Sequence, residues 1–196
     1  MQIIKDLTDA ETLLPDEIDD SDFGRPSKWA AKGILSRVYL TNKKYADAKT
    51  KLTEIISSKK YRLLDDYKQR MADVHLMMAE VLNETNGAME DVLGNLNAVR
   101  ERGGLNKYLA TDFSTKGEIL DAILNERRIE LSFEDLRWFD LLRTGKAIEV
   151  MNKKNTGGNN PDAASAHPYT SIDQSHLLYP IPQAQVDASG GVLTQN

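Results

Sequence analysis

The densest group of charged and aromatic side chains in this sequence lies in the segment ERRIELSFEDLRWFDLLRTG, residues 126–145. Glu126, Glu130 and Glu134 recur every four residues, so a helix would place them on one face, with Cβ atoms about 5–6 Å apart. Retaining glycosidases hold their two catalytic carboxyl groups roughly 5–5.5 Å apart. The spacing of these acids therefore raises one candidate chemistry, the hydrolysis of a glycosidic bond.

A structural role for the same acids is the better-supported interpretation, because any two glutamates four residues apart on a helix show this separation. Arginines lie within one helical turn of these acids and of Asp140, at positions Arg127, Arg128, Arg137 and Arg143. Arg137 is three residues from both Glu134 and Asp140, so it is placed to pair with both. We interpret the segment as a lattice of salt bridges that locks a buried helix joint, and we expect no enzymatic activity.

The remaining motifs predict no metal or cofactor site. RTGKA, residues 143–147, lacks the earlier glycine, the Ser or Thr after the lysine and the preceding strand of a phosphate-binding loop. His75, His167 and His176 share no metal-ligand spacing. His75 adjoins an apolar helix stripe, so we expect a packed structural histidine there, whereas the other two histidines are expected in solvent. NNPD, residues 159–162, lacks the spacing of a calcium loop.

Aromatic side chains outside the apolar stripes are the candidates for stacking on sugar rings, since flat aromatic faces suit the apolar faces of pyranoses. We select three on this ground as candidate ligand-binding residues, Trp29, Tyr169 and Tyr179. Trp138 lies in the most apolar stretch of the chain, so it is expected in the core.

Length and composition indicate a globular protein with enough residues for one domain or two small ones, and we expect a single domain over residues 1–196. Hydrophobic residues make up 40% and charged residues 28% of the 196 residues, and the net charge is −5. A net negative charge argues against nucleic acid as the main partner, because that partner needs a basic stripe. The chain has no cysteine, which excludes disulfides and thiolate metal sites. No apolar run approaches the roughly 18 residues of a membrane-spanning helix, and the acidic start shows no apolar core of an export signal.

Apolar residues recur at helical spacing and predict an all-α fold. We expect hairpins resembling tetratricopeptide (TPR) repeats at 26–58 and 71–102, packed around a central helix pair at 115–145 that is rich in Arg, Glu and aromatic residues. The expected helices run near 27–41, 45–58, 71–84, 88–101, 116–132 and 134–144. Phe139 and Trp138 should then be largely buried. After a polar loop that begins at 152, the prolines predict an extended strap up to residue 196.

The segment NERRIELSFEDLRWFDLLRTG closely resembles the signature ERR-x-EL-x-FE-x-x-RWFDL-x-R of the SusD/RagB-like family. Three further stretches resemble family motifs in the family's order. They are GRPSKWAAKGILSRVYL with the helix that follows it, ADVHLMMAEVLNETNG with LNAVRERGGL, and the closing LLYPIPQAQVDASGGVLTQN. Together these motifs cover most of the chain.

The resemblance implies a non-catalytic, nutrient-binding lipoprotein of Bacteroidetes. Such proteins sit at the cell surface over a TonB-dependent outer-membrane transporter and bind oligosaccharides in polysaccharide utilization. It also implies that the signature residues are structural and do not contact the ligand; in this sequence they are Arg127, Arg128, Glu130, Glu134, Arg137, Trp138, Phe139 and Asp140.

The chain departs from the family pattern in three places. It shows no signal sequence or lipidated cysteine. The long segment that the family carries between its hairpins is also missing, since only three residues separate Tyr67 from Met71. His75 stands at a position that is usually apolar. We therefore expect mainly the helical scaffold of a glycan-binding protein, without its main binding insert. The alternative from another class is a soluble TPR-like adaptor that holds a partner protein.

If Arg137 pairs with Glu134 and Asp140 in a partly buried site, the Arg137→Ala variant should lose about 1–3 kcal/mol of unfolding free energy, because two carboxylates lose their partner. Urea unfolding of the variant and the parent protein measures this loss. A change within experimental error would mean that the three side chains form a solvated surface network.

Overall fold

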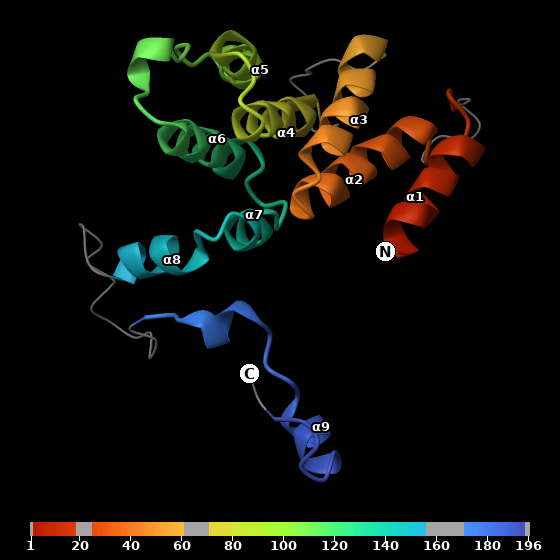
Figure 1. Cartoon of the computed structure of the whole chain (residues 1–196), viewed down its shortest axis with the longest axis vertical. Helices are drawn as coiled ribbons and strands as arrows, with labels where there is room; N and C mark the ends of the chain where they lie inside the picture. Colours follow the sequence, from red (N-terminus) through yellow and green to blue (C-terminus); the bar gives the residue numbers. More distant parts are fainter. Residues whose placement is uncertain (1, 19–24, 61–70, 156–170, 195–196) are drawn as a thin grey trace. The chain divides into compact units, whose positions relative to one another are not determined.

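The computed structural model describes residues 2–18, 25–60, 71–155 and 171–194 (Figure 1). These ranges contain α-helices and short 3-10 helices and no β-strand, which confirms the all-α fold. They fall into two compact units, one reaching Ser132 and one starting at Phe133. The single domain expected from composition stays a prediction, and the two units have separate internal packing.

The first unit contains two helix hairpins with further helices packed against them. Its helices are α1 (Gln2–Leu13), α2 (Lys28–Thr41), α3 (Tyr45–Ser58), α4 (Met71–Glu84), α5 (Met89–Arg102), the 3-10 helix η2 (Ala110–Asp112) and α6 (Lys116–Glu130). Helices α2 and α3 form one hairpin, and α4 and α5 form the other. Helix α3 also packs on α4, α4 on α6, and α1 on α2 (Figure 1). Helices α2 to α6 end within two residues of their predicted bounds, so the TPR-like hairpins are confirmed, whereas α1 was not predicted.

Both hairpins turn in the same way, which supports their description as a repeat. Lys43 and Asn86 adopt left-handed backbone conformations, with φ of 57° and 55°. The next residue in each turn donates its backbone N–H to a carbonyl five residues earlier, from Lys44 to Tyr39 at 2.8 Å and from Gly87 to Leu82 at 2.7 Å. This is the bond that closes a Schellman motif after a helix.

Local capping fixes the start of α6 as its sequence indicates. The Thr115 hydroxyl accepts a hydrogen bond from the backbone N–H of Glu118 at 3.2 Å, and the Glu118 carboxylate accepts one from the N–H of Thr115 at 3.3 Å. These reciprocal bonds satisfy two donors that the first turn of a helix leaves unpaired. Thr115 and Glu118 therefore form a capping box.

Helix α4 is the centre of the first unit. Of its 14 residues, 12 are buried, among them the polar Asp73, Glu80 and Asn83. Around it lie fully buried side chains from the other helices, including Leu52 of α3 and Leu96 of α5. A helix that is buried on all sides must be apolar on all sides or must pair its polar groups.

In the second unit, the helix predicted near 134–144 is present but begins later, at Arg137. Phe133 and Asp135 have φ of 67° and 57°, a left-handed conformation that a continuing helix excludes. Helix α7 (Arg137–Arg143) therefore has only two turns. Phe139 is 57% exposed and Trp138 is half-buried, so the expected burial of Phe139 is also wrong. So short a helix has few buried positions, and in α7 they are Asp140 and Leu141.

The chain beyond α7 is more helical than its prolines predicted. Helix α8 (Ala147–Asn155) passes the expected loop start at 152, and two short helices follow, η4 (Gln174–Leu177) and α9 (Gln183–Ala188). The fully extended strap is thus corrected. Pro182 is the residue before α9, a place where proline is compatible with a helix because no N–H is needed there. The Asn152 side chain joins α8 to the later segment, donating to the Ile172 carbonyl at 2.9 Å and accepting from its N–H at 2.7 Å.

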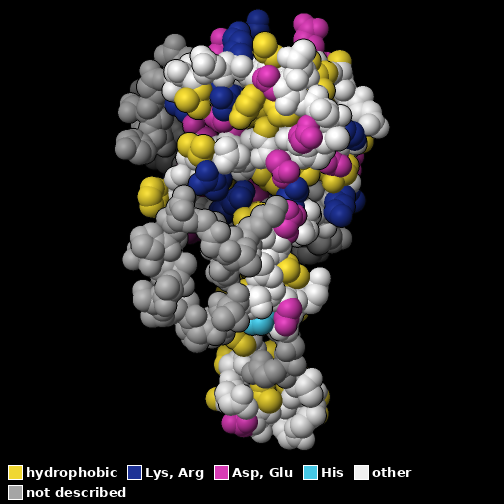
Figure 2. Space-filling view, turned by 90° about the vertical axis from the view of Figure 1, so that its left-hand side faces the viewer, with side chains coloured by type: hydrophobic (Ala, Val, Ile, Leu, Met, Phe, Trp, Pro, Cys, Tyr) yellow, Lys and Arg dark blue, Asp and Glu magenta, His cyan; other side chains and the backbone are white. Residues whose placement is uncertain are grey.

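The surface of the described residues is mixed in charge. Basic and acidic side chains alternate over the face in Figure 2, with small apolar areas between them. This face carries no basic stripe of the kind that nucleic acids need. Among the described helices, none is both long and apolar enough to cross a membrane.

Two glycines of the second hairpin should respond in opposite ways to alanine. A Cβ atom added at Gly87 would lie 3.0 Å from a Leu82 methyl carbon and 3.1 Å from the Leu82 carbonyl oxygen. The Gly87→Ala variant should lose about 1–3 kcal/mol of unfolding free energy, because the turn and the buried Leu82 would have to shift. Gly94 lies within α5 with open space around it, so Gly94→Ala should gain about 0.5–1 kcal/mol. Urea unfolding measures both, and equal effects would contradict the crowded turn.

Candidate functional site

The signature residue Arg127 lies in a buried ion cluster that joins three helices of the first unit. Its Nη1 donates to Oδ1 of Asp73 at 2.8 Å, and both side chains are almost fully buried. Arg37 of α2 donates from Nη2 to the other carboxylate oxygen of Asp73, at 2.6 Å. One carboxylate from α4 therefore holds α2 and α6 in place.

Two opposing effects act on the Asp73 carboxyl. Burial raises its pKa, and the charges and hydrogen bonds of Arg127 and Arg37 lower it by more, so that the net pKa lies below the ordinary value. Asp73 is thus ionised in the folded protein at neutral pH. Its charge favours folding because both arginines compensate it inside the core.

Glu126 and the signature acid Glu130 take part in a second set of ion pairs, between α5 and α6. The buried Glu126 accepts from Nη1 of Arg100 at 2.8 Å, and Glu130 pairs with Arg102. Arg100 also lies over the Tyr108 ring, 3.9 Å from its centre. Both acids thus form ion pairs between helices, and their partners come from α5 and not from their own segment.

The catalytic arrangement of three glutamates on one helix face does not form. Helix α6 ends at Glu130, so Glu134 is not on the same helix as Glu126. In the second unit Asp140 accepts from Nη2 of Arg143 at 2.7 Å. The pairing of Arg137 with Glu134 and Asp140 stays a prediction. Arg128 is exposed, and its Nη2 donates a hydrogen bond to the nearby Asn125 side chain at 2.9 Å.

Trp29, a candidate for stacking on sugar, is held by charged neighbours. Its indole N–H donates to Oδ1 of Asp16 at 2.6 Å. Ammonium groups lie 4.7–5.8 Å from the centre of its ring and belong to Lys28, Lys32 and Lys60. Cations at this distance are attracted to an aromatic face, so they compete with a sugar for it.

The same lysines fix the ionisation of Asp16. Hydrogen bonds from Lys60 and Lys28 lower the pKa of the Asp16 carboxyl to about 2. The Trp29 ring and this carboxylate thereby join the segment after α1 to the start of α2 and the end of α3. We infer a structural role for Trp29.

The other candidate residues are differently placed. Tyr179 is 81% exposed, as a stacking residue would have to be. Tyr169 and His167 lie outside the described residues. His75 packs between α4 and α5, with Nδ1 2.8 Å from Oδ1 of Asn95, which confirms a structural histidine. His176 is exposed, as expected; its Nδ1 is 2.9 Å from the Asp173 carboxylate at the start of η4. In the described part of the chain, no group of three His, Asp or Glu side chains is suited to hold a metal ion.

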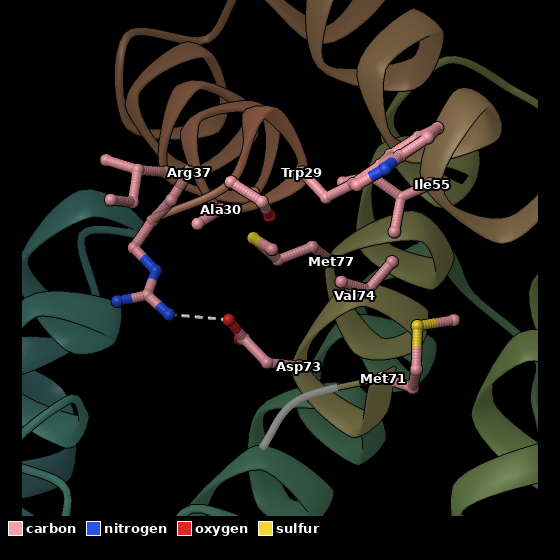
Figure 3. Close-up of a pocket in the computed structure, with 11 residues that line it drawn as sticks. Trp29, Ala30, Arg37, Ile55, Met71, Asp73, Val74 and Met77 are labelled. Atoms are coloured by element: carbon pink, nitrogen blue, oxygen red, sulfur yellow. Dashed lines mark hydrogen bonds and ion pairs between the residues drawn. The ribbon is translucent and has the colours of Figure 1, made fainter. Parts of the chain in front are cut away.

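Sequence reasoning missed a pocket of about 400 Å³ between α2, α3 and α4 (Figure 3). Its walls are mostly apolar, and the Arg37–Asp73 ion pair lies along one side. The described residues that line it are Ser27, Trp29, Ala30, Gly33, Ile34, Arg37, Ile55, Met71, Asp73, Val74 and Met77. One signal was available, because an aspartate inside the apolar run MADVHLMMA needs a buried partner.

Replacing Asp73 tests the ion cluster. The Asp73→Asn variant should lose about 3–5 kcal/mol of unfolding free energy at neutral pH, because the buried Arg127 keeps its charge and loses this carboxylate. Urea unfolding measures the loss. As a control, Lys5→Ala removes the exposed pair between Lys5 and Asp9 and should leave the midpoint unchanged.

The stability of the parent protein should also depend on pH through Asp73. Because folding lowers its pKa, the carboxylate stabilises the folded state fully above its unfolded pKa of about 3.9, and this contribution is lost as the pH falls through the folded pKa. The difference in stability between the parent and Asp73→Asn should therefore shrink below about pH 4. A constant difference between pH 7 and pH 3 would contradict the assignment.

The chain matches two protein-family models. Residues 22–196 match the model of the SusD family. Residues 1–40 match a model described as starch-binding associating with outer membrane. The family resemblance stated from the sequence motifs is confirmed.

Similar proteins agree with these matches. SusD-like protein P38 of Formosa agariphila is 40% identical over 117 residues, which are 57% of this chain and 20% of that protein. A SusD-like protein of Bacteroides ovatus is 38% identical over 81 residues, 40% of this chain and 14% of that protein. The chain spans about a fifth of the length of the curated relatives that it matches.

Solved structures share the fold at low sequence identity. A SusD superfamily protein from Bacteroides vulgatus superposes with a TM-score of 0.73 at 16% identity, over 94% of this chain and 65% of that chain. Surface glycan-binding protein A from Bacteroides thetaiotaomicron, in complex with laminarihexaose, gives a TM-score of 0.72 at 17% identity, over 99% and 70% of the two chains. The motifs, the helix hairpins and the family model, which covers most of the sequence, lead to one conclusion: this chain belongs to the SusD family.

Proposed function

We propose that this protein is a glycan-binding component of an outer-membrane nutrient-uptake system, and that its described helices are mainly the scaffold of that component. Membership of the SusD family supports the proposal. So does the name of a structural relative, a laminarin binding SusD-like protein with a TM-score of 0.70 at 20% identity. The second family match, described as starch-binding associating with outer membrane, supports the same compartment.

The scaffold role rests on one observation, the use of Glu126, Arg127 and Glu130 in ion pairs between helices. Arg127 and Glu126 are almost fully buried and paired with Asp73 and Arg100 at 2.8 Å. Side chains fixed in this way are not available to bind a sugar. The ligand surface must then lie elsewhere, at exposed side chains.

The same observation supports a binding protein that is not an enzyme. A glycosidase needs two carboxyl groups that face one substrate. Glu126 and Glu130 instead face Arg100 and Arg102. We propose that the chain binds glycan without cleaving it.

The candidate contact in the described residues is Tyr179, whose side chain is 81% exposed. It lies between η4 and α9, in a segment where Pro180 and Pro182 restrict the backbone. A restricted backbone presents an aromatic ring at a lower entropic cost. One such ring gives weak binding, because a sugar exchanges water hydrogen bonds for protein ones at little net gain.

We also propose the partners that the family resemblance implies, an oligosaccharide and an outer-membrane transporter. The full-length protein would be a surface-exposed lipoprotein that delivers oligosaccharide to a TonB-dependent transporter. The segment that the family carries between its hairpins would supply most of the ligand surface. This chain, with three residues between Tyr67 and Met71, should therefore bind glycan weakly.

Nuclear magnetic resonance titration with laminarihexaose tests the proposal, because it detects weak binding and locates it. We expect a dissociation constant in the millimolar range or weaker, with shifted amide signals confined to the residues around Tyr179. Tyr179→Ala should abolish these shifts, and the matched variant Tyr179→Phe should keep them because it retains the ring. The oligosaccharide should be recovered uncleaved.

Three results would contradict parts of this proposal. A micromolar constant would show that the scaffold itself carries the main site. Cleavage of the oligosaccharide, abolished by Glu130→Gln, would show an enzyme. An absence of shifts with every glycan of a panel would instead favour the TPR-like adaptor.

A further inference from the structure

The pocket between α2, α3 and α4 is lined by residues of the first unit and differs in chemistry from the exposed Tyr179. Its volume of about 400 Å³ lies in the range of small-molecule sites, roughly 300–1,000 Å³. Apolar side chains form most of its wall, including Ile55 of α3 and Met71, Val74 and Met77 of α4 (Figure 3). An oligosaccharide does not suit this wall, since most of its hydroxyl groups would lose water without gaining a partner.

Small residues on α2 keep the pocket open. Ala30 and Gly33 both line it. A Cβ atom added at Gly33 would meet no atom within 4 Å. Glycine within a helix lowers its stability, so a larger residue at this position would strengthen α2 and would take up pocket space. Gly33 therefore offers a way to close the pocket without damaging the fold.

One side of the pocket carries a guanidinium group with donors to spare. Figure 3 shows the Arg37 side chain reaching from α2 towards Asp73 on α4. Its bond to Asp73 occupies Nη2, and the buried Nε has no acceptor among the described residues. A guanidinium has five N–H donors. Because Asp73 also accepts from Arg127, it compensates the charge of Arg37 only in part.

The Arg37 side chain is also accessible, with 43% of its surface exposed, whereas that of Asp73 is 3% exposed. A ligand entering the pocket would thus meet the cation and not the anion of this pair. Arginine binds carboxylates through charge-assisted hydrogen bonds, which are about twice as strong as neutral ones. The apolar wall and the accessible cation together select an amphiphilic anion.

We propose that this pocket binds a small monocarboxylate with an apolar body. The body would pack against Met71, Val74 and Met77, and the carboxylate would accept hydrogen bonds from Arg37. This site is independent of the proposed glycan binding, and either one can fail without the other.

The methionine methyl groups report on the pocket directly. Met71 and Met77 line it, whereas Met89 lies in α5 and does not. The intact protein, labelled with ¹³C at its methionine methyl groups, is titrated with 3-phenylpropionate as the probe. We expect the signals of Met71 and Met77 to shift together, with a dissociation constant on the order of 0.1–1 mM, and the Met89 signal to stay in place.

Two matched controls separate pocket binding from surface binding. The neutral isostere 3-phenylpropanamide should bind at least tenfold more weakly, because it removes only the negative charge. Gly33→Leu should abolish the shifts by filling the pocket. Gly94→Leu, which places the same side chain in the open space beside α5, should leave them unchanged.

The proposal is overturned if Met71 and Met77 do not respond at 10 mM probe, an amount about tenfold above the weakest expected constant. It is also overturned if Met89 shifts equally, if the amide binds as well as the acid, or if Gly33→Leu still binds. The thermal midpoint of each leucine variant confirms that it is folded, so loss of binding in Gly33→Leu reports on the pocket. Laminarihexaose, added as a further arm, should not shift Met71 or Met77.

Discussion

The packing of the first unit depends on compensating the negative charge of the buried Asp73 carboxylate. It lies in a helix that is buried on all sides, where an ionised group is tolerated only if its charge is compensated. Arg127 and Arg37 provide that compensation from α6 and α2, at 2.8 and 2.6 Å. Apolar packing brings the helices together, and it is not directional. The two arginines add direction, because each guanidinium must reach one particular oxygen of Asp73.

Ion pairs between helices also account for the charged residues Glu126, Arg127 and Glu130 near the end of α6. Arg100 of α5 pairs with Glu126 of α6, and Arg102 of α5 pairs with Glu130 of α6. These two pairs restrict how the helices can align, because each guanidinium must reach one particular carboxylate. The charged side chains of this part of α6 therefore contribute to helix packing.

The sequence predicted the features of this protein that depend on local spacing. The helical spacing of its apolar residues predicted both hairpins and placed the start of α6 at residue 116, where the structure has it. The break before α7 was not predictable, because phenylalanine rarely adopts the left-handed conformation that Phe133 has. The many apolar residues of 133–144 predict a helix buried on several sides, and for this reason the burial of Phe139 was predicted wrongly.

The partners of Asp73 escaped prediction for a different reason. Arg37 is 36 residues before it and Arg127 is 54 residues after it, and no rule of spacing connects positions so far apart. The surroundings of Trp29 were missed in the same way, since Asp16, Lys32 and Lys60 come from three different segments. The sequence identifies these residues, whereas their contacts are seen only in the tertiary structure.

The sequence separation of these partners also bears on how the first unit comes apart. If α2 or α6 detached while α4 stayed packed, Asp73 would remain in an apolar environment with only one of its arginines. Detachment of either α2 or α6 thus raises the free energy of the helices that stay packed. Long-range ion pairs of this kind make a stack of hairpins behave as one cooperative unit, whereas repeat proteins held by contacts between neighbours can lose their end repeats separately.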